Sequence, residues 1–348
     1  MRAVWFDEFS ARPVLRDVPD PVPSPRGVVV RVEATGLCRS DVHGWLGHDD
    51  GISLPHVPGH ELVGTITVLG DDVHRFRVGD RVTTPFVCAC GHCPECVSGN
   101  GQVCRNQTQP GFTHWGSFAD LVALHDADTN LIPVPASLDA GAAALLGCRF
   151  ATSYRGLVHQ AHLVAGESLV VVGCGGVGLS AIMIGAALGA DVVAVDIDAT
   201  ALRRAARFGA TTTIDSSGLT RAAVLEAVRG AAPSGAHVSV DALGREETAA
   251  VGILSLRPRG RHVQIGLFPS DPVIPMGTVI GKELAVLGSH GMPAQDYPGL
   301  LDLVAAGELR PQELIERRIP LEEVPDALLA MADDRSAGGV TVVDVTSC

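Results

Sequence analysis

Four cysteines between residues 90 and 104 constrain this chain more than any other feature of its sequence. They are separated by two, two and seven residues: Cys90, Cys93, Cys96 and Cys104. Four thiolates at such spacings suit a closed tetrahedral zinc site, which stabilises a fold but leaves no open position for chemistry. Because Gly91 and Pro94 lie between the ligands, we predict a loop wrapped around the ion, without a helix.

The alternatives for these cysteines are two disulfides or a set of inert buried thiols. The chain contains nine cysteines, an odd number, and its first 25 residues are rich in charges and prolines instead of the apolar core of a signal peptide. We therefore favour the metal. Cys88 stands two residues before the lobe and is surplus to the four ligands.

The whole chain has the length and composition of a two-domain globular protein. It has 348 residues, 46% of them hydrophobic, and a net charge of −13, which argues against non-specific binding of nucleic acid. The uncharged stretch from Leu169 to Ala190 is long enough to cross a membrane, but glycines interrupt its first half. We read it as a buried strand followed by a buried helix. The expectation is a soluble, cytoplasmic protein with neither a membrane nor a nucleic-acid partner.

Short strand signals dominate the first third. Residues 28–34, 61–69 and 81–84 are rich in β-branched side chains and are separated by Gly/Asp turns. Strands at such close intervals predict a small β-barrel or sandwich.

The middle of the chain carries a dinucleotide-binding pattern. An apolar strand over Ser168–Val172 leads into a G-x-G-x-x-G motif, an uncharged helical stretch, and a second strand that ends at Asp196. Glycines between a strand and a helix let the backbone approach a pyrophosphate, and the acid about 20 residues later binds ribose hydroxyls. A carboxylate there would repel a 2′-phosphate, which predicts NAD over NADP. Further strand and helix signals alternate up to residue 266, as in a parallel doubly wound sheet.

Two further segments, Gly36–His43 and Gly59–Glu61, together with the four-Cys lobe, resemble the zinc-containing alcohol dehydrogenases of the medium-chain dehydrogenase/reductase family. The resemblance extends over essentially the whole chain. It implies an α/β fold in which a GroES-like β-barrel catalytic domain (residues 1–149 and 288–348, with the structural lobe at 88–104) is joined to a Rossmann domain (residues 150–287).

The resemblance also implies two zinc ions per chain. Cys38, His60 and Cys148 match the family's ligands for a catalytic zinc, and the lobe would hold the structural one. Three protein ligands leave the fourth position free for water or substrate. Asp41 and Glu61 are candidates for orienting those ligands through hydrogen bonds.

Other site residues are implied in the same way. Ser40 and His43 resemble a relay that carries a proton away from the alcohol, and Arg39 resembles a contact to the pyrophosphate. Phe86 is a candidate wall of the substrate pocket; Trp45 and Trp115 are weaker candidates, since each suits a core as well. The expected cofactor contacts are Thr152, Gly173, Gly175, Gly176, Val177, Gly178, Asp196, Ile265, Gly266 and Leu267. Ala201 stands where many relatives carry a lysine near the ribose.

The activity implied is reversible hydride transfer between an alcohol, primary or aromatic, and NAD. Polyol dehydrogenases and dehydrogenases of a formaldehyde–thiol adduct are the alternatives on the same scaffold, and the three candidate ligands disfavour the zinc-free quinone reductases. A non-catalytic zinc- or NAD-binding protein is the alternative outside the enzymes. The family favours a homo-oligomer, tetramer or dimer. The residue spacing leaves the substrate undefined.

Overall fold

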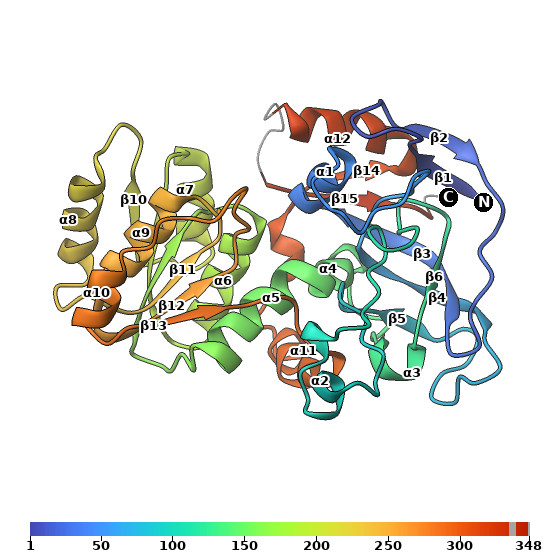
Figure 1. Ribbon diagram of the computed structural model, residues 1–348, viewed down its shortest axis with the longest axis horizontal. Helices are drawn as coiled ribbons and strands as arrows, with labels where there is room; N and C mark the ends of the chain where they lie inside the picture. The colour runs from blue at the N-terminus through green and yellow to red at the C-terminus, as the bar shows by residue number, and fades with distance from the viewer. Residues whose placement is uncertain (334–338, 347–348) are drawn as a thin grey trace. The chain divides into compact units, whose positions relative to one another are not determined.

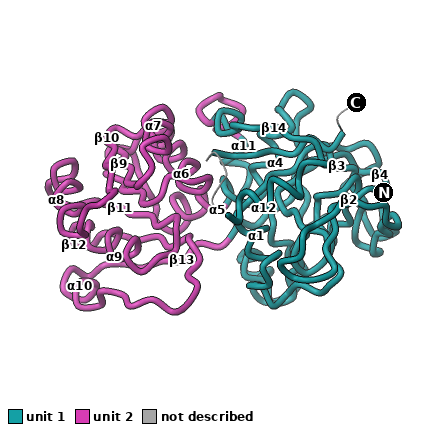
Figure 2. Tube along the Cα trace, turned by 90° about the horizontal axis from the view of Figure 1, so that it is seen from above, with its two compact units in different colours: residues 1–151, 291–301, 310–348 teal, residues 152–290, 302–309 magenta. Residues whose placement is uncertain are grey.

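The structure, a computed structural model, describes residues 1–333 and 339–346. The chain divides into two compact units (Figure 2). Unit 1 comprises residues 1–151, 291–301 and 310–348, and unit 2 comprises residues 152–290 and 302–309. The unit borders therefore fall two and three residues after the domain borders inferred from sequence, and residues 302–309 group with unit 2.

Unit 1 is built on a seven-stranded sheet (Figure 1). Its order is β14 (Ile315–Pro320), β15 (Val340–Asp344), β3 (Val28–Leu37), β4 (Glu61–Leu69), β5 (Arg81–Thr83) and β7 (Ile132–Pro133), and β6 (Leu121–Leu124) also pairs with β3. Only the β14–β15 pair is parallel. A separate two-stranded sheet joins β1 (Arg2–Trp5) to β2 (Val14–Asp17). The strands predicted from residues 28, 61 and 81 are thus present.

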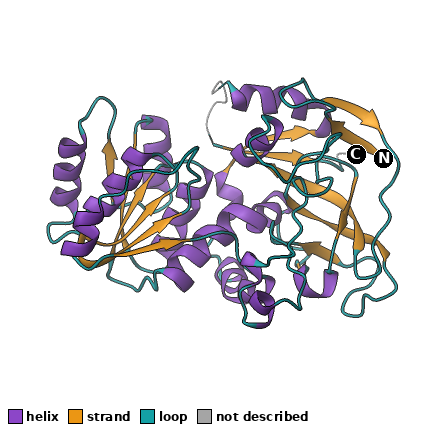
Figure 3. Cartoon of the chain, in the orientation of Figure 1, coloured by secondary structure: helices purple, strands orange, loops and turns teal. Residues whose placement is uncertain are grey.

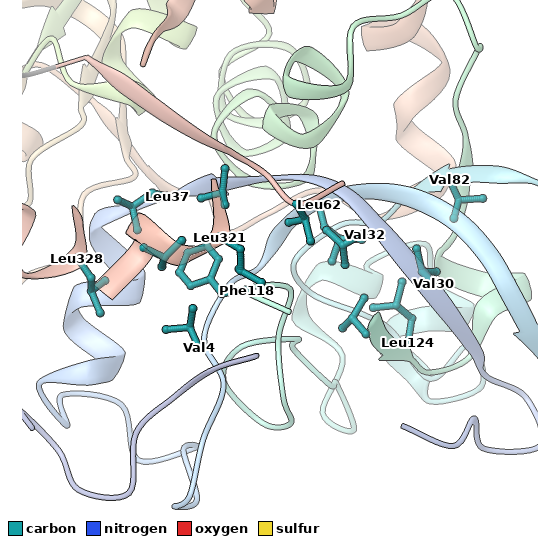
Figure 4. Packing of buried hydrophobic residues seen from close by; sticks show 14 of the residues in the cluster. Val4, Val30, Val32, Leu37, Leu62, Val82, Phe118, Leu124, Leu321 and Leu328 are labelled. Atoms are coloured by element: carbon teal, nitrogen blue, oxygen red, sulfur yellow. The ribbon is translucent and has the colours of Figure 1, made fainter. Parts of the chain in front are cut away.

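The core of unit 1 forms because β3 alternates side chains between two faces. Val28, Val30 and Val32 are fully buried on one face; on the other face Val29 is buried as well, whereas Arg31 is exposed. Figure 4 shows the cluster that Val28, Val30 and Val32 join, with side chains from β4, β6 and the C-terminal segment. Each fully buried valine or leucine contributes roughly 1.5–3 kcal/mol of hydrophobic stabilisation.

Short helices complete unit 1: α1 (Arg39–Trp45), α2 (Pro94–Val97), α3 (Ala127–Asn130), α4 (Ala140–Leu145), α11 (Tyr297–Ala305), which continues into unit 2, and α12 (Val324–Ala332). Helix α2 corrects our prediction that Gly91 and Pro94 exclude a helix from the four-Cys lobe. Pro94 occupies the first helical position, where a backbone N–H has no intrahelical partner, so a proline there costs no hydrogen bond.

Unit 2 is the predicted parallel doubly wound sheet. Its order is β10 (Thr212–Asp215), β9 (Asp191–Asp196), β8 (Ser168–Val172), β11 (Ala236–Asp241), β12 (Leu256–Gln264) and β13 (Ala285–Gly288), and all neighbouring pairs are parallel. Figure 3 shows the helices beside this sheet: α6 (Gly176–Ala187), α7 (Ala199–Arg207), α8 (Arg221–Ala231), α9 (Glu246–Leu254) and α10 (Met276–Gly281). The strand order reverses between β8 and β11, and ligands of such sheets bind where this happens.

One irregular helical stretch runs through the unit border. Two π-helical turns, Leu146–Phe150 and Arg155–Gln160, flank α5 (Ala151–Tyr154). Short 3₁₀ turns lie at Gly101–Val103, Ala294–Asp296, Pro311–Leu314 and Leu321–Glu323. Within the described residues, no helix is both long and apolar enough to span a bilayer.

Candidate metal and cofactor sites

The four cysteines of the lobe converge. The Cys93 Sγ lies 3.4 Å from the Cys96 Sγ and 3.6 Å from the Cys104 Sγ, and the Cys90 and Cys96 sulfurs are 4.0 Å apart. Zinc–sulfur bonds of about 2.3 Å in a tetrahedron place the sulfurs roughly 3.8 Å apart. The observed distances fit that geometry, and all eight cysteines within the described residues are free thiols.

Backbone amides donate hydrogen bonds to the sulfurs of this lobe. The amides of Cys90 and Asn106 donate to the Cys104 sulfur at 3.4 and 3.3 Å. Burial opposes ionisation of Cys90, but backbone hydrogen bonds from the turn that follows lower its pKa to about 6. Asn130 of α3 ties the lobe to the rest of unit 1 by accepting from the Ala89 amide at 2.7 Å and donating to the Ala89 carbonyl at 2.9 Å.

Cys88 does not join the four sulfurs. Its thiol is buried, 3.4 Å from the Thr84 hydroxyl and 3.5 Å from the Pro85 carbonyl. Burial raises its pKa to about 12, so at neutral pH it is an un-ionised thiol within the fold.

A second group of metal-binding side chains lies in unit 1. Donor atoms of Cys38, His60, Glu61 and Cys148 all lie within 4.8 Å of one another. Cys38 precedes α1, His60 immediately precedes β4, Glu61 is the first residue of β4, and Cys148 lies in the first π-helical turn. The Nε2 atom of His60 is buried and has no hydrogen-bond partner in the described structure. A buried imidazole nitrogen beside two thiols is the donor set of a zinc site, so the residues fit the implied metal.

The two thiols of this group differ in acidity. A hydrogen bond between them lowers the pKa of Cys38 well below its ordinary value, despite burial, and raises that of Cys148 well above it. Burial lowers the pKa of His60. The Asp41 carboxylate and Cys38 raise it by more than burial lowers it, so the pKa lies well above its ordinary value. The site therefore gathers a thiolate where a cation would be held.

Asp41 organises this group. Its carboxylate accepts from the Nδ1 of His60 at 2.9 Å, from the Gly59 amide at 3.2 Å and from the Cys38 amide at 2.9 Å. Because Nδ1 is the donor in this bond, the neutral imidazole carries its lone pair on Nε2, the atom that would bind a metal. The bond to Cys38 also caps the N-terminus of α1. Gly59 itself has φ +102°, and a side chain there would collide with the Phe118 amide.

Glu61 forms an ion pair that sequence reasoning did not find. Arg149, which follows Cys148, donates its Nε to the Glu61 carboxylate at 3.0 Å and its terminal nitrogen at 2.6 Å. The side chains are 5% and 0% exposed. The same guanidinium donates to the Leu37 carbonyl at 3.2 Å. Arg149 thus links the ends of the segments that carry Cys38, His60 and Cys148.

The predicted relay and pyrophosphate residues all lie on α1. Ser40 is partly buried, and its Oγ lies 3.8 Å from the Cys38 sulfur. His43 is exposed, with Nδ1 3.2 Å from the Nδ1 of His48. Arg39 is exposed, and its guanidinium donates to the Met331 carbonyl at 2.9 Å.

Among the candidate pocket residues, the structure separates Phe86 from the two tryptophans. The Phe86 ring lies 6.1 Å from the His60 ring. Phe112, which sequence reasoning missed, is closer, at 5.2 Å. Trp45 packs in the barrel core with its indole nitrogen bonded to the Ala11 carbonyl. Trp115 packs edge-on against Trp5 with centroids 5.0 Å apart, outside the group of metal-binding side chains.

The glycine loop of unit 2 has the geometry its pattern predicts. It follows β8 and leads into α6, whose N-terminus has no side-chain cap. Gly173 has φ +95°, and a side chain on Gly178 would lie 1.7 Å from the Gly173 carbonyl. A side chain on Gly175 would extend into open space. Uncapped amides beside that space fit a pyrophosphate. Gly176 and Val177 form the first turn of α6.

Asp196 lies beside this loop at the end of β9. Its carboxylate accepts from the Cys174 amide at 2.5 Å and from the Asp198 amide at 2.9 Å. The acid and the glycine loop therefore form one local structure, as a ribose-binding acid requires.

A buried polar network supports the remaining predicted contacts. The backbone amides of Ile265 and Gly266 donate to the Asp241 carbonyl at 3.1 and 2.9 Å, and Leu267 is 74% exposed. Gln264 donates to the Asp241 carboxylate at 2.9 Å, a bond absent from our sequence predictions. Thr152 is buried, and its carbonyl accepts from Ser289 at 3.0 Å.

Comparison with known proteins gives a consistent result for both units. Residues 24–136 match the family described as "Alcohol dehydrogenase GroES-like domain", and residues 176–306 match "Zinc-binding dehydrogenase". An NAD-dependent alcohol dehydrogenase of Sulfurisphaera tokodaii is 31% identical over 99% of this chain and 100% of its own length. A probable D-xylulose reductase A of Aspergillus terreus is 34% identical over 90% of this chain and 89% of its own. Alcohol dehydrogenase TADH from Thermus sp. ATN1 superposes with a TM-score of 0.90 at 30% identity, with 99% and 100% of the two chains covered.

Two family matches, one for each half of the chain, and relatives similar over nearly its whole length leave a single assignment. The chain belongs to the zinc-binding alcohol dehydrogenases of the medium-chain dehydrogenase/reductase family, and it is an oxidoreductase.

Proposed function

We propose that this protein oxidises a primary or aromatic alcohol reversibly with NAD, at a zinc ion held by Cys38, His60 and Cys148. The observation that carries the proposal is the buried, unpartnered Nε2 of His60 beside the thiols of Cys38 and Cys148. When bound, zinc supplies a Lewis acid that lowers the pKa of an alcohol hydroxyl. When bound, NAD supplies the hydride acceptor.

The chain's own residues position the reactants and move the proton. Asp41 fixes the tautomer of His60, and Arg149 holds the Glu61 carboxylate beside the donor group. Ser40 suits the first relay position because a hydroxyl both accepts and donates. His43 takes the proton as the base nearer solvent. Phe86 and Phe112, whose rings both lie near the His60 ring, supply apolar surface, which supports primary or aromatic substrates.

Asp196 supports NAD over NADP. Its carboxylate is fixed by two backbone amides, and it would meet a 2′-phosphate with like charge. The Sulfurisphaera relative is likewise described as NAD-dependent. In the same proposal Arg39 and the amides of α6 bind the pyrophosphate, and Ile265–Leu267 contact the nicotinamide.

A polyol is the second candidate substrate class, because the Aspergillus relative is named a D-xylulose reductase. A thiol adduct of formaldehyde is a third.

We also infer a homo-oligomer, dimer or tetramer, that associates through β13. This strand ends the sheet of unit 2 and exposes Val286, and the segment that precedes it in the chain exposes further apolar side chains: Val273, Met276 and Ile280. Light scattering of the purified protein measures the number of chains in the oligomer.

The free thiols support a reducing compartment, and we propose the cytoplasm.

The deciding experiment is NADH formation from a panel of primary, aromatic, secondary and polyhydroxy alcohols, each with and without a chelator. Cys148→Ser provides the matched variant. We expect chelator-sensitive turnover of primary or aromatic alcohols, lost in the variant although NAD still binds. Turnover of polyols alone would reassign the substrate. Full activity of Cys148→Ser would refute the ligand assignment.

A further inference from the structure

Two histidines meet at the exposed end of α1. His43 lies in the last turn of the helix, and His48 follows it in the next loop. Their Nδ1 atoms are 3.2 Å apart, and their ring centroids are 5.5 Å apart. The His48 amide also donates to the His43 carbonyl at 3.0 Å, so the backbone holds the two side chains together. His43 is the base proposed above, and His48 has no role in the reaction so far.

A hydrogen bond between two imidazole nitrogens contains one proton. One ring donates its Nδ1–H and the other accepts with a lone pair. If His43 donates, His48 accepts and keeps its own proton on Nε2. The second ring nitrogen of His43 is then unprotonated and free to take a proton from the reaction. The pair is therefore suited to receive a proton at one ring and release one from the other.

The charges around His43 favour its neutral form. Burial lowers the pKa of His43, and the neighbouring His48 imidazole and Arg39 guanidinium lower it further, while Cys38 raises it. Asp49 and Asp50 follow His48 in the loop, and Asp49 is bonded to the Gly51 amide. A neutral imidazole at physiological pH is the form that can act as a base.

We propose that His48 is a positioning residue that acts through His43 and completes the path by which the proton reaches solvent. His43 gains a proton on Nε2, its Nδ1–H bond breaks, and the same proton forms a new bond to Nδ1 of His48. His48 then releases its Nε2 proton to water or buffer. Rotation of the exposed rings restores the starting arrangement. This inference rests on the proposed function, which supplies the proton.

Turnover in weak buffer tests the path. His48→Gln removes the acceptor at the protein surface, and His74→Gln, an exposed histidine outside the site, is the matched control. We expect His48→Gln to lower kcat about three- to tenfold in dilute buffer, part of the effect of a general base. KM should stay unchanged, added imidazole should restore the rate, and the acid limb of the pH profile should move to higher pH. A rate that equals the control, or a loss that imidazole does not restore, would overturn the proposal.

A second measurement separates this proposal from the alcohol dehydrogenase assignment. NMR of ¹⁵N-labelled histidine follows the titration of His43 without substrate. Since His48 lowers the pKa of His43, His48→Gln should raise it; an unchanged titration would show that the two rings do not interact and would overturn the path. If the wild-type protein turns over no alcohol but His48→Gln still raises the pKa of His43, the proposed function is refuted, whereas the interaction between the two histidines is confirmed.

Discussion

Replacing Asp41 with asparagine should weaken one metal site and leave the other intact. The carboxylate accepts three hydrogen bonds, from the amides of Cys38 and Gly59 and from the His60 imidazole. An asparagine keeps one oxygen and turns an NH₂ group toward one of these donors. A buried donor without an acceptor costs about 1–3 kcal/mol.

The effect on the metal can be estimated separately. Loss of a partner that orients a metal-bound histidine lowers metal affinity about 10- to 100-fold. That range corresponds to about 1.4–2.7 kcal/mol of binding free energy. The hydrogen bonds described for the four sulfurs of the lobe do not involve Asp41, so its zinc should be unaffected and serves as an internal reference.

The assay is competition of the zinc-loaded enzyme with a chromogenic chelator, which resolves two zinc equivalents. We expect one equivalent to be released at 10- to 100-fold lower chelator activity in Asp41→Asn, and the other at the wild-type value. Asp198→Asn is the control: Asp198 caps α7 through the Thr200 amide at 2.8 Å, and asparagine caps equally well. Wild-type affinity at both sites, or equal weakening of both, would refute this role of Asp41.

Three other changes give measurable outcomes. Asp196→Gly should raise the ratio of NADP to NAD turnover, because the fixed carboxylate beside the ribose is removed; an unchanged ratio of kcat/KM values would contradict the assignment. Arg149→Met should lower the free energy of unfolding by about 3–5 kcal/mol in urea titrations, because Glu61 is left buried and unpaired, whereas Arg77→Met, at an exposed pair, should cost under about 1 kcal/mol. Burial lowers the pKa of His114 from 6.5 to about 4, so stability is full above pH 6.5 and falls as the unfolded state takes up a proton below it. Its share of the loss should reach about 2 kcal/mol at pH 5, and His114→Asn should flatten the pH dependence.

Local patterns explain what the sequence could predict. The strand, glycine loop and helix from Ser168 to Ala187 follow from adjacent residues, as do the four cysteines of the lobe, which lie within fifteen positions. The group of Cys38, His60 and Cys148 was placed through resemblance alone, because no periodicity joins residues so far apart in the chain.

Contacts that depend on topology were not predictable. Arg149 and Glu61 are 88 positions apart, and only the packing of the π-helical turn beside β4 brings them together. The Gln264–Asp241 bond likewise requires that β11 and β12 be neighbours. The sequence around Phe112 does not distinguish it from an ordinary core aromatic residue, and only the fold brings it beside the His60 ring. The prediction of a helix-free lobe failed because it treated Pro94 as a breaker regardless of position.

The pairing of β3 with β15 sets the order in which a newly synthesised chain can mature. Residues 341–344 pair with residues 34–37, immediately before Cys38, although some 300 residues separate them. The ribosome therefore releases Cys38 long before its supporting strand exists, whereas the lobe can load its ion from one short stretch. Structural zinc should bind early, and the catalytic ion should be captured only after the last strand has emerged.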